Sequence, residues 1–166
     1  MTNTPLAPWR AAARAPIVRE IDHIAVHCTA TPAGRAVTVE EIRAWHREKG
    51  WSDIGYHFVV ALDGTIGIGR PKAQPGAHVQ GFNARSIGVV YVGGLAANGS
   101  PADTRTAAQK AALLDLLREL KSVHRSAVIQ GHRDFSPDRD GNGRIEPNEW
   151  LKACPCFDAK TEYAAV

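Results

Sequence analysis

Three residues in this sequence are of the types that hold a catalytic zinc ion. His27 ends one apolar run, His132 follows another, and Cys154 lies in the sequence Lys152-Ala153-Cys154-Pro155. Two imidazoles and one thiolate are a complete set of protein ligands for catalytic zinc and leave the fourth position open for water. The three residues are too far apart in the sequence for a zinc finger, so only the fold can bring them together.

Apolar runs and turn residues predict the elements that position these side chains. We expect strands at residues 21–27, 56–62, 65–69, 86–92 and 127–130, and helices that begin at the capping boxes of residues 38–41 and 106–109. If strands 21–27 and 127–130 are parallel neighbours, His27 and His132 leave the same edge of the sheet. The pattern predicts an α/β fold with a central mixed β-sheet flanked by helices.

The length of 166 residues fits one domain with a core of its own. We expect residues 1–19, rich in Pro, Ala and Arg, to form a flexible N-terminal arm, and residues 20–166 to form a single catalytic domain. The chain shows no apolar segment of membrane-spanning length and no secretory signal. Its three cysteines predict free or metal-bound thiols in a reducing cytoplasm. A net charge of +3 suits an anionic polymer but excludes no class of partner.

Seven motifs follow one another in order from about residue 20 to residue 160. They are residues 26–31, 41–46, 50–58, 76–78, 83–89, 131–134 and 152–158. Together they closely resemble the zinc-dependent N-acetylmuramoyl-L-alanine amidases, specifically the short phage endolysins that share their fold with peptidoglycan recognition proteins. The resemblance implies an amidase of the same fold, which hydrolyses the amide bond between N-acetylmuramoyl and L-alanine in peptidoglycan.

The resemblance also implies a ligand set for Zn²⁺, namely His27, His132 and Cys154. Cys156 stands two residues from Cys154 and offers a second thiol. In the family the ligand follows Lys-Ala and precedes Pro, which favours Cys154. Cys28 directly follows His27, so its side chain points to the other face of an extended strand, away from the metal.

Further roles follow from the same resemblance. Lys152 stands where the family places a lysine that stabilises the oxyanion of the transition state. Tyr56 occupies a second catalytic position, where it hydrogen-bonds the zinc water or the leaving group. His78 and Asn83 resemble positions that line the groove for the peptide stem and the muramic sugar, and are expected to bind substrate.

A second metal-binding pattern lies between His132 and Cys154. Residues 138–149 match the EF-hand calcium loop, in which Asp-x-Asp-x-Asn-Gly is followed by five residues and Glu. The expected ligands of Ca²⁺ are Asp138, Asp140, Asn142, Glu149 and the backbone carbonyl of Arg144. No helix is expected before the loop, so the alternative is an acidic turn that needs no ion. Bound calcium would have a structural role and would fix the approach to Cys154.

The predicted function is that of a phage or prophage endolysin, made in the host cytoplasm without a signal peptide and acting on the cell wall after release. Its expected partner is peptidoglycan, with no nucleic acid and no stable membrane insertion, and the chain is expected to be a monomer. One alternative is a bacterial cytoplasmic amidase that recycles muropeptides, although those relatives typically use an aspartate as third ligand. Another is a non-catalytic peptidoglycan-binding module, which usually lacks the thiolate.

Overall fold

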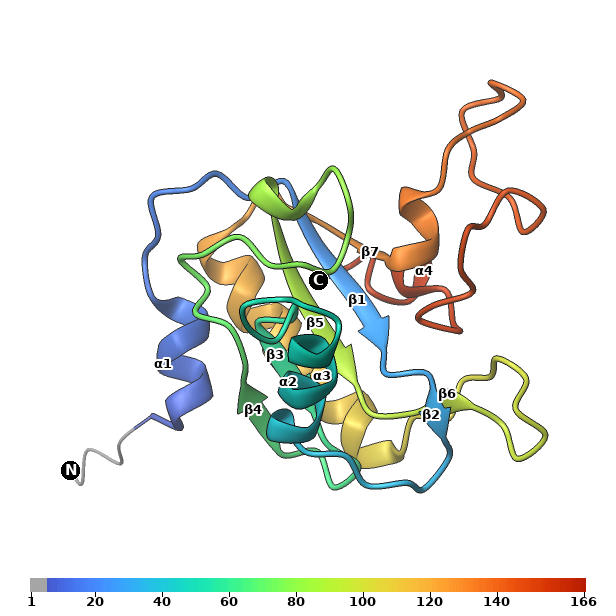
Figure 1. The fold of residues 1–166 in the computed structure, drawn as a ribbon. Coiled ribbons are helices and arrows are strands. Elements are labelled where there is room, and N and C mark those ends of the chain that lie inside the picture. Colours follow the sequence, from blue (N-terminus) through green and yellow to red (C-terminus); the bar gives the residue numbers. More distant parts are fainter. Residues whose placement is uncertain (1–5) are drawn as a thin grey trace.

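The structure, a computed structural model, describes residues 6–166, and its centre is a five-stranded mixed sheet (Figure 1). The strand order is β4-β3-β5-β1-β7. The strands are β1 (His23–Cys28), β3 (Phe58–Val60), β4 (Ile66–Ile68), β5 (Ser86–Tyr91) and β7 (Val128–Gly131). All neighbours are parallel except β3 and β4, which form an antiparallel hairpin. The predicted α/β class with a central mixed sheet is confirmed.

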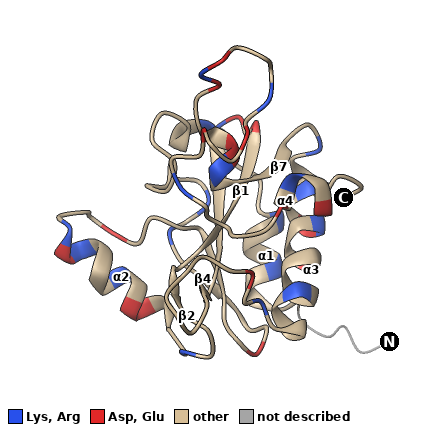
Figure 2. Ribbon diagram, turned by 90° about the vertical axis from the view of Figure 1, so that its right-hand side faces the viewer, with Lys and Arg blue, Asp and Glu red and all other residues tan. Residues whose placement is uncertain are grey.

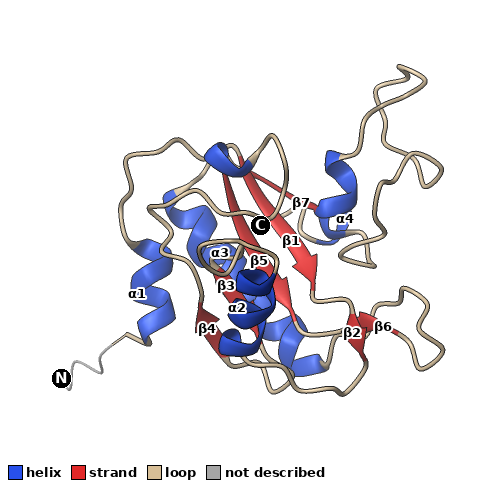
Figure 3. Cartoon of the chain, viewed as in Figure 1, coloured by secondary structure: helices blue, strands red, loops and turns tan. Residues whose placement is uncertain are grey.

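Helices cover both faces of the sheet (Figure 3). Helix α3 (Ala107–Val123) buries four leucines against one face, and helix α2 (Val39–Glu48) buries Ile42 against the other. Both helices begin at the predicted capping boxes, in which the threonine hydroxyl accepts from a backbone N–H one turn later. Strand β3 is shorter than the predicted run of residues 56–62, but it is buried on both faces, as that run indicated.

The N-terminal region differs from the expected flexible arm. Residues 8–14 form helix α1 (Pro8–Arg14), with Pro8 at the first turn, where a missing N–H costs nothing. Ala13 is fully buried in the α3 side of the core, and Arg10 and Arg14 form ion pairs with Glu119 of α3. The helix is too short to show an apolar period in the sequence, and tertiary contacts hold it. Residues 1–5 of the expected arm lie outside the described residues.

The remaining elements are short and lie around the edges of the sheet. Strands β2 (Thr31–Pro32) and β6 (Gly94–Leu95) form a small parallel sheet. Two 3-10 turns, η1 (Asn83–Arg85) and η2 (His132–Phe135), and helix α4 (Ala159–Glu162) complete the set. Between η2 and α4, residues 137–153 contain neither helix nor strand and project from the body of the protein (Figure 1). Both signs of charge lie on this projecting segment (Figure 2). Within residues 6–166, no helix combines the length and the apolar character needed to cross a membrane.

Candidate metal centre and active site

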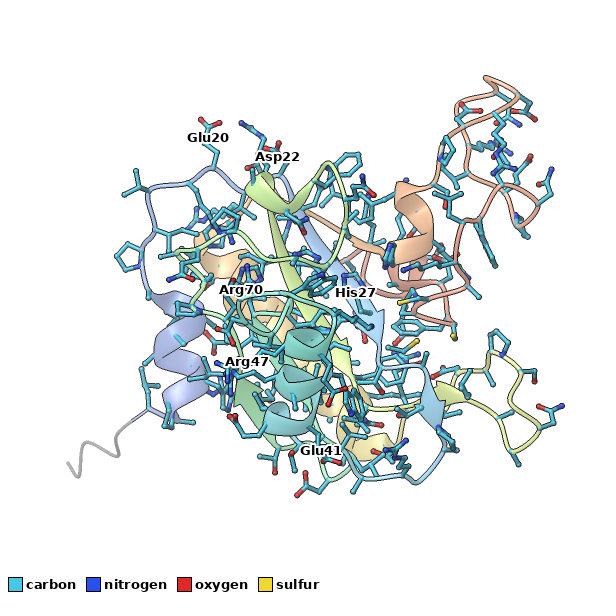
Figure 4. All side chains as sticks on the ribbon, viewed as in Figure 1. Glu20, Asp22, His27, Glu41, Arg47 and Arg70 are labelled. Atoms are coloured by element: carbon cyan, nitrogen blue, oxygen red, sulfur yellow. The ribbon has the colours of Figure 1, made fainter. Side chains whose placement is uncertain are left out.

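The two histidines meet because their strands are neighbours. Strands β1 and β7 are parallel, and Val26 is in register with Gly131, so His27 and His132 follow at the same edge of the sheet. Their Nδ1 atoms lie 3.1 Å apart. Figure 4 shows His27 at the end of β1, on the side toward the projecting segment. The predicted convergence of the two imidazoles at one sheet edge is confirmed.

Cys154 completes the cluster from a distant part of the chain. Its Sγ lies 3.8 Å from His27 Nδ1 and accepts a hydrogen bond of 3.3 Å from the backbone N–H of Cys28. One donor atom from each of His27, His132 and Cys154 falls within 4.8 Å of the others. The structure therefore brings together the three residues for which the sequence predicted a shared site.

Three contacts fix the backbone around Cys154. The carbonyl of Cys154 accepts from Arg133 N at 2.8 Å, and the carbonyl of Pro155 accepts from the Tyr91 hydroxyl at 2.7 Å. Pro155 also packs against Gly131, where an added Cβ would lie 2.4 Å from the proline ring. Gly131 therefore lets the cysteine segment approach the end of β7 closely.

The donor set fits zinc in both chemistry and spacing. In a tetrahedral zinc site with ordinary bond lengths, two nitrogens lie about 3.3 Å apart and a nitrogen and a sulfur about 3.6 Å apart. The corresponding distances here are 3.1 Å between the imidazoles and 3.8 Å from His27 to the thiol. Imidazole together with thiolate is also a donor combination that suits zinc.

His78 contacts the other nitrogen of His27. The Nε2 of His27 lies 3.1 Å from His78 Nδ1, and His78 Nε2 lies 3.4 Å from the Ser86 hydroxyl. Gly88 makes room for this ring, since a Cβ there would lie 2.6 Å from it. If Nδ1 of His27 bound a metal, the hydrogen bond at Nε2 would fix the tautomer and orientation of the ring. This contact was not predictable from the sequence, because nothing in the spacing of His27 and His78 indicates it.

Burial keeps the imidazoles of His27 and His132 neutral. Loss of solvation lowers the pKa of His27 well below its usual value, and the neighbouring His78, His132 and Lys152 lower it further. Burial, followed by the charge of Lys152, lowers the pKa of His132 to about 4. Neutral imidazole is the form that binds a metal, so both side chains are ready as ligands at neutral pH.

Tyr56 and Lys152 both lie near the cluster. The Tyr56 ring packs 5.1 Å from the His27 ring, and burial raises the pKa of its hydroxyl, which keeps the group protonated. The loop that carries Tyr56 is held in part by His46, whose Nδ1 accepts from Gly55 N at 2.9 Å. Lys152 is exposed and lines a cleft of about 510 Å³ together with His132.

The predicted substrate-binding residues lie on the same cleft. His78 and Asn83 both line it, as do the partly exposed Trp51 and Leu151. The Asn83 side-chain oxygen accepts from the backbone N–H groups of His78 and Val79 at 2.8 and 2.9 Å. Asn83 therefore holds the wall of the cleft in shape, in addition to lining it.

Comparison with known proteins agrees with this geometry. Residues 18–149 match the Amidase_2 family, described as N-acetylmuramoyl-L-alanine amidase. The chain belongs to this family. An endolysin of Klebsiella phage KP32 is 45% identical over 142 residues, which cover 86% of this chain and 85% of the relative.

Solved structures place the amidase among known folds. The N-acetylmuramoyl-L-alanine amidase LysC from Clostridium intestinale superimposes with a TM-score of 0.65 at 27% identity, covering 90% of this chain and 87% of LysC. Bumblebee PGRP-SA gives a TM-score of 0.67 at 22% identity, covering 90% of this chain and 83% of that one, which shows a shared fold. The fold predicted from the resemblance is thereby confirmed.

The amidase also carries the acidic loop in which calcium ligands were predicted. Side-chain oxygens of Asp138, Asp140 and Glu149 lie within 4.8 Å of one another. Glu149 is buried, and its carboxylate accepts from the backbone N–H groups of Arg139 and Glu146 at 2.6 and 3.0 Å. These N–H groups lower the pKa of Glu149 and keep it ionised. The Asn142 side-chain oxygen accepts from Arg144 N at 2.8 Å.

Proposed function

We propose that this amidase holds Zn²⁺ between His27 Nδ1, His132 Nδ1 and Cys154 Sγ, and uses it to cut the bond between N-acetylmuramoyl and L-alanine in peptidoglycan. The observation that carries the proposal is the convergence of these three donors in a chain of the amidase family. A bound zinc ion supplies Lewis acidity toward a carbonyl oxygen and makes a water acidic enough to attack at neutral pH.

The role proposed for Lys152 follows from its charge and position. Amide hydrolysis develops negative charge on the carbonyl oxygen, and a cation at that oxygen stabilises charge that exists only in the transition state. Lys152 is the cation that faces the cleft beside His132, and its charge is felt at both ligand histidines. An exposed lysine side chain can reach the substrate as it binds in the cleft.

Tyr56 is proposed to donate a hydrogen bond to the attacking water or to the leaving amine. The raised pKa of its hydroxyl supports a donor that stays protonated throughout. His78 is proposed to orient His27 through Nε2, and together with Asn83 to line the subsite for the peptide stem and muramic sugar. Displacement of Tyr56 would leave the ligand residues in place but misalign the reacting atoms.

The biological setting proposed is that of an endolysin that acts on the cell wall after release from the cytoplasm. The similarity to a phage endolysin along most of both chains supports this setting. Cys154 at the third ligand position argues against the cytoplasmic recycling amidases, and the full ligand set argues against a non-catalytic binding module. We also propose a monomer that binds no nucleic acid, which light scattering and a DNA-binding assay would check.

The decisive experiment is mass spectrometry of the soluble products released from purified sacculi. We expect free stem peptides that begin with unmodified L-alanine, and their loss in the variant Cys154→Ala. Disaccharide-peptides with an intact lactyl amide would contradict the amidase reaction. Binding of sacculi without product would favour a binding module, and activity on soluble fragments alone would favour the recycling enzyme.

Calcium binding by the loop of residues 138–149 is a second, structural part of the proposal. The side-chain oxygens of Asp138, Asp140 and Glu149 converge, and Asn142 and the Arg144 carbonyl stand at the remaining ligand positions of the calcium-loop pattern. A cation there would offset the mutual repulsion of the carboxylates. Because residues 150–154 follow at once, a bound ion would also restrain the segment that carries Lys152 and Cys154.

The calcium proposal is tested by melting curves and metal analysis of the zinc-loaded protein. We expect Ca²⁺ to raise the melting temperature by a few degrees, roughly the effect of 1–2 kcal/mol in a chain of this size. Glu149→Gln should remove the increase, whereas Glu48→Gln, which changes the charge equally at an exposed position on α2, should keep it. Absence of both stoichiometric calcium and the increase would refute a calcium site.

A further inference from the structure

Two cysteines outside the proposed ligand set face each other across the end of the sheet. The Sγ atoms of Cys28 and Cys156 lie 3.7 Å apart, although the residues are far apart in the sequence. Cys28 ends β1, and Cys156 lies after the projecting segment of residues 137–153, in the turn before α4. Figure 4 shows the sulfur atoms, in yellow, gathered near the end of β1.

The surroundings hold the two thiols in this arrangement. Gly94 leaves space beside Cys28, since a Cβ at that position would lie 2.5 Å from the Cys28 sulfur. The Cys156 thiol also donates to the Gly94 carbonyl at 3.4 Å, and its backbone N–H donates to Ala153 at 2.8 Å. Cys156 adopts a φ of 72°, a conformation that a non-glycine residue takes only when its neighbours enforce it. The fold therefore holds the two sulfur atoms next to each other.

We propose that Cys28 and Cys156 are a disulfide-forming pair, oxidised by a small-molecule or protein disulfide when the protein reaches an oxidising compartment. The partly exposed Cys156 sulfur attacks the oxidant and releases one thiol from it, which leaves a mixed disulfide. The Cys28 sulfur then attacks Cys156 and releases the second thiol. One S–S bond forms, one is cleaved, and the two protons of the cysteines end on the two released thiols.

Cys154 does not take part in this reaction in the zinc-loaded protein. Its sulfur lies beside His27 Nδ1, where the proposed metal would bind it as a thiolate. The Cys28 thiol hydrogen-bonds with both Cys156 and Cys154, and the Cys156 thiol also contacts the Gly94 carbonyl. Metal binding at Cys154 would thus leave Cys28 and Cys156 as the two thiols that can pair.

The cross-link would join the two parts of the metal centre. Cys28 follows the ligand His27 directly, and Cys156 lies two residues after the ligand Cys154. A bond between them would tie the end of β1 to the cysteine segment, beside the core cluster to which Cys28 belongs. An enzyme that acts on the cell wall meets oxidising conditions outside the cytoplasm, so this setting rests on the proposed function, whereas the chemistry of the pair does not.

The test is oxidation of the zinc-loaded protein with oxidised glutathione, followed by counting of free thiols after denaturation and by peptide mapping. We expect the wild type to pass from three free thiols to one, with a peptide that links Cys28 to Cys156. The oxidised form should melt about 5–10 °C higher, since a bond that closes a long loop restricts the unfolded chain. Cys156→Ser should keep both of its thiols and its melting temperature under the same treatment.

Three results would overturn the proposal, and none depends on amidase activity. The first is an unchanged thiol count in a folded wild-type protein, and the second is a cross-link that maps to Cys154. The third is a stable glutathione adduct on Cys156 with Cys28 still free. The variant Cys28→Ser, compared with Cys156→Ser by circular dichroism, separates loss of the pair from a failure to fold. A protein that forms the bond but releases no stem peptides would keep this inference and refute the proposed function.

Discussion

His27 and His132 leave the ends of two neighbouring parallel strands, whereas Cys154 ends an irregular segment that begins at residue 137. Strand pairing places the histidines, because Val26 is paired with Gly131 and the residue that follows each of them is a histidine. Individual contacts place the cysteine: one from Arg133, one from Tyr91 and close packing on Gly131. The candidate metal centre therefore has a sheet half, His27 and His132, placed by strand pairing, and a cysteine half, Cys154, placed by a few local contacts.

The largest expected difference between these halves appears when a ligand is removed. His27→Ala and Cys154→Ala should both lose zinc and lower activity by about 10³-fold or more, the equivalent of several kcal/mol. In the metal-free proteins, His27→Ala should also lower the free energy of unfolding by roughly 2–5 kcal/mol, because it empties a buried site in the sheet. Cys154→Ala should leave it nearly unchanged. Equal destabilisation of the two apo-proteins, measured by urea unfolding, would show that the halves do not differ.

Lys152 tests whether the irregular segment also supplies charge to the reaction. Lys152→Ala should reduce kcat by roughly 10²–10³-fold while the zinc content stays the same, because the lost charge acts in the transition state. Lys160→Ala, an exposed lysine of α4, serves as the matched control and should keep full activity. Zinc analysis beside the turnover of sacculi distinguishes this effect from loss of the metal, which would contradict the assigned role.

A variant of His78 tests how far the sheet half of the centre depends on the contact behind His27. His78→Gln should weaken zinc binding by about 10–100-fold, because His27 loses the partner of its Nε2. A chelator competition measures this affinity, and the visible spectrum of the cobalt-substituted protein should change with the altered geometry. His124→Gln, a partly buried histidine that contacts Lys72 instead, should leave both unchanged. An unaltered affinity in His78→Gln would mean that strand pairing alone orients His27.

As pH falls, the stability contributed by buried His57, beside the sheet, should be lost before that contributed by the loop of residues 138–149. Burial lowers the pKa of His57 to about 4, and both of its ring nitrogens are engaged by Gly88 N and the Gln74 carbonyl. Between pH 6.5 and about 4 the unfolded chain binds the proton and the folded one does not, so stability falls as pH falls. Each pH unit in this window costs about 1.4 kcal/mol for this group alone. Asp138 and Glu149 have lowered pKa values, so the stability they contribute is lost only at lower pH. Urea unfolding of the metal-free protein at pH 7 and pH 5 measures how the free energy of unfolding depends on pH. An equal free energy at the two pH values would contradict a lowered pKa of His57.

Much of the fold was predictable because its signals are local. The two capping boxes, the leucine period of α3 and the apolar run around Val59 each depend on residues that are close in the chain. Helix α1 was not predictable in this way, because a short segment of Ala and Arg is helical here through its contacts with α3. The ligand set came from the order of the motifs and their resemblance to a family. Neither source indicated that His78 supports His27 or that Cys28 faces Cys156.

The sequence by itself determined the residue types of the candidate metal centre, the strands that carry the two histidines and the acidic loop before Cys154. These follow from chemistry and from patterns that repeat within a few residues. Only the tertiary structure decided which imidazole nitrogens face each other, which ring lies behind them and which thiols are neighbours. Such contacts join residues far apart in the chain, and strand order and close packing at Gly131, Gly88 and Gly94, rather than sequence spacing, set their distances.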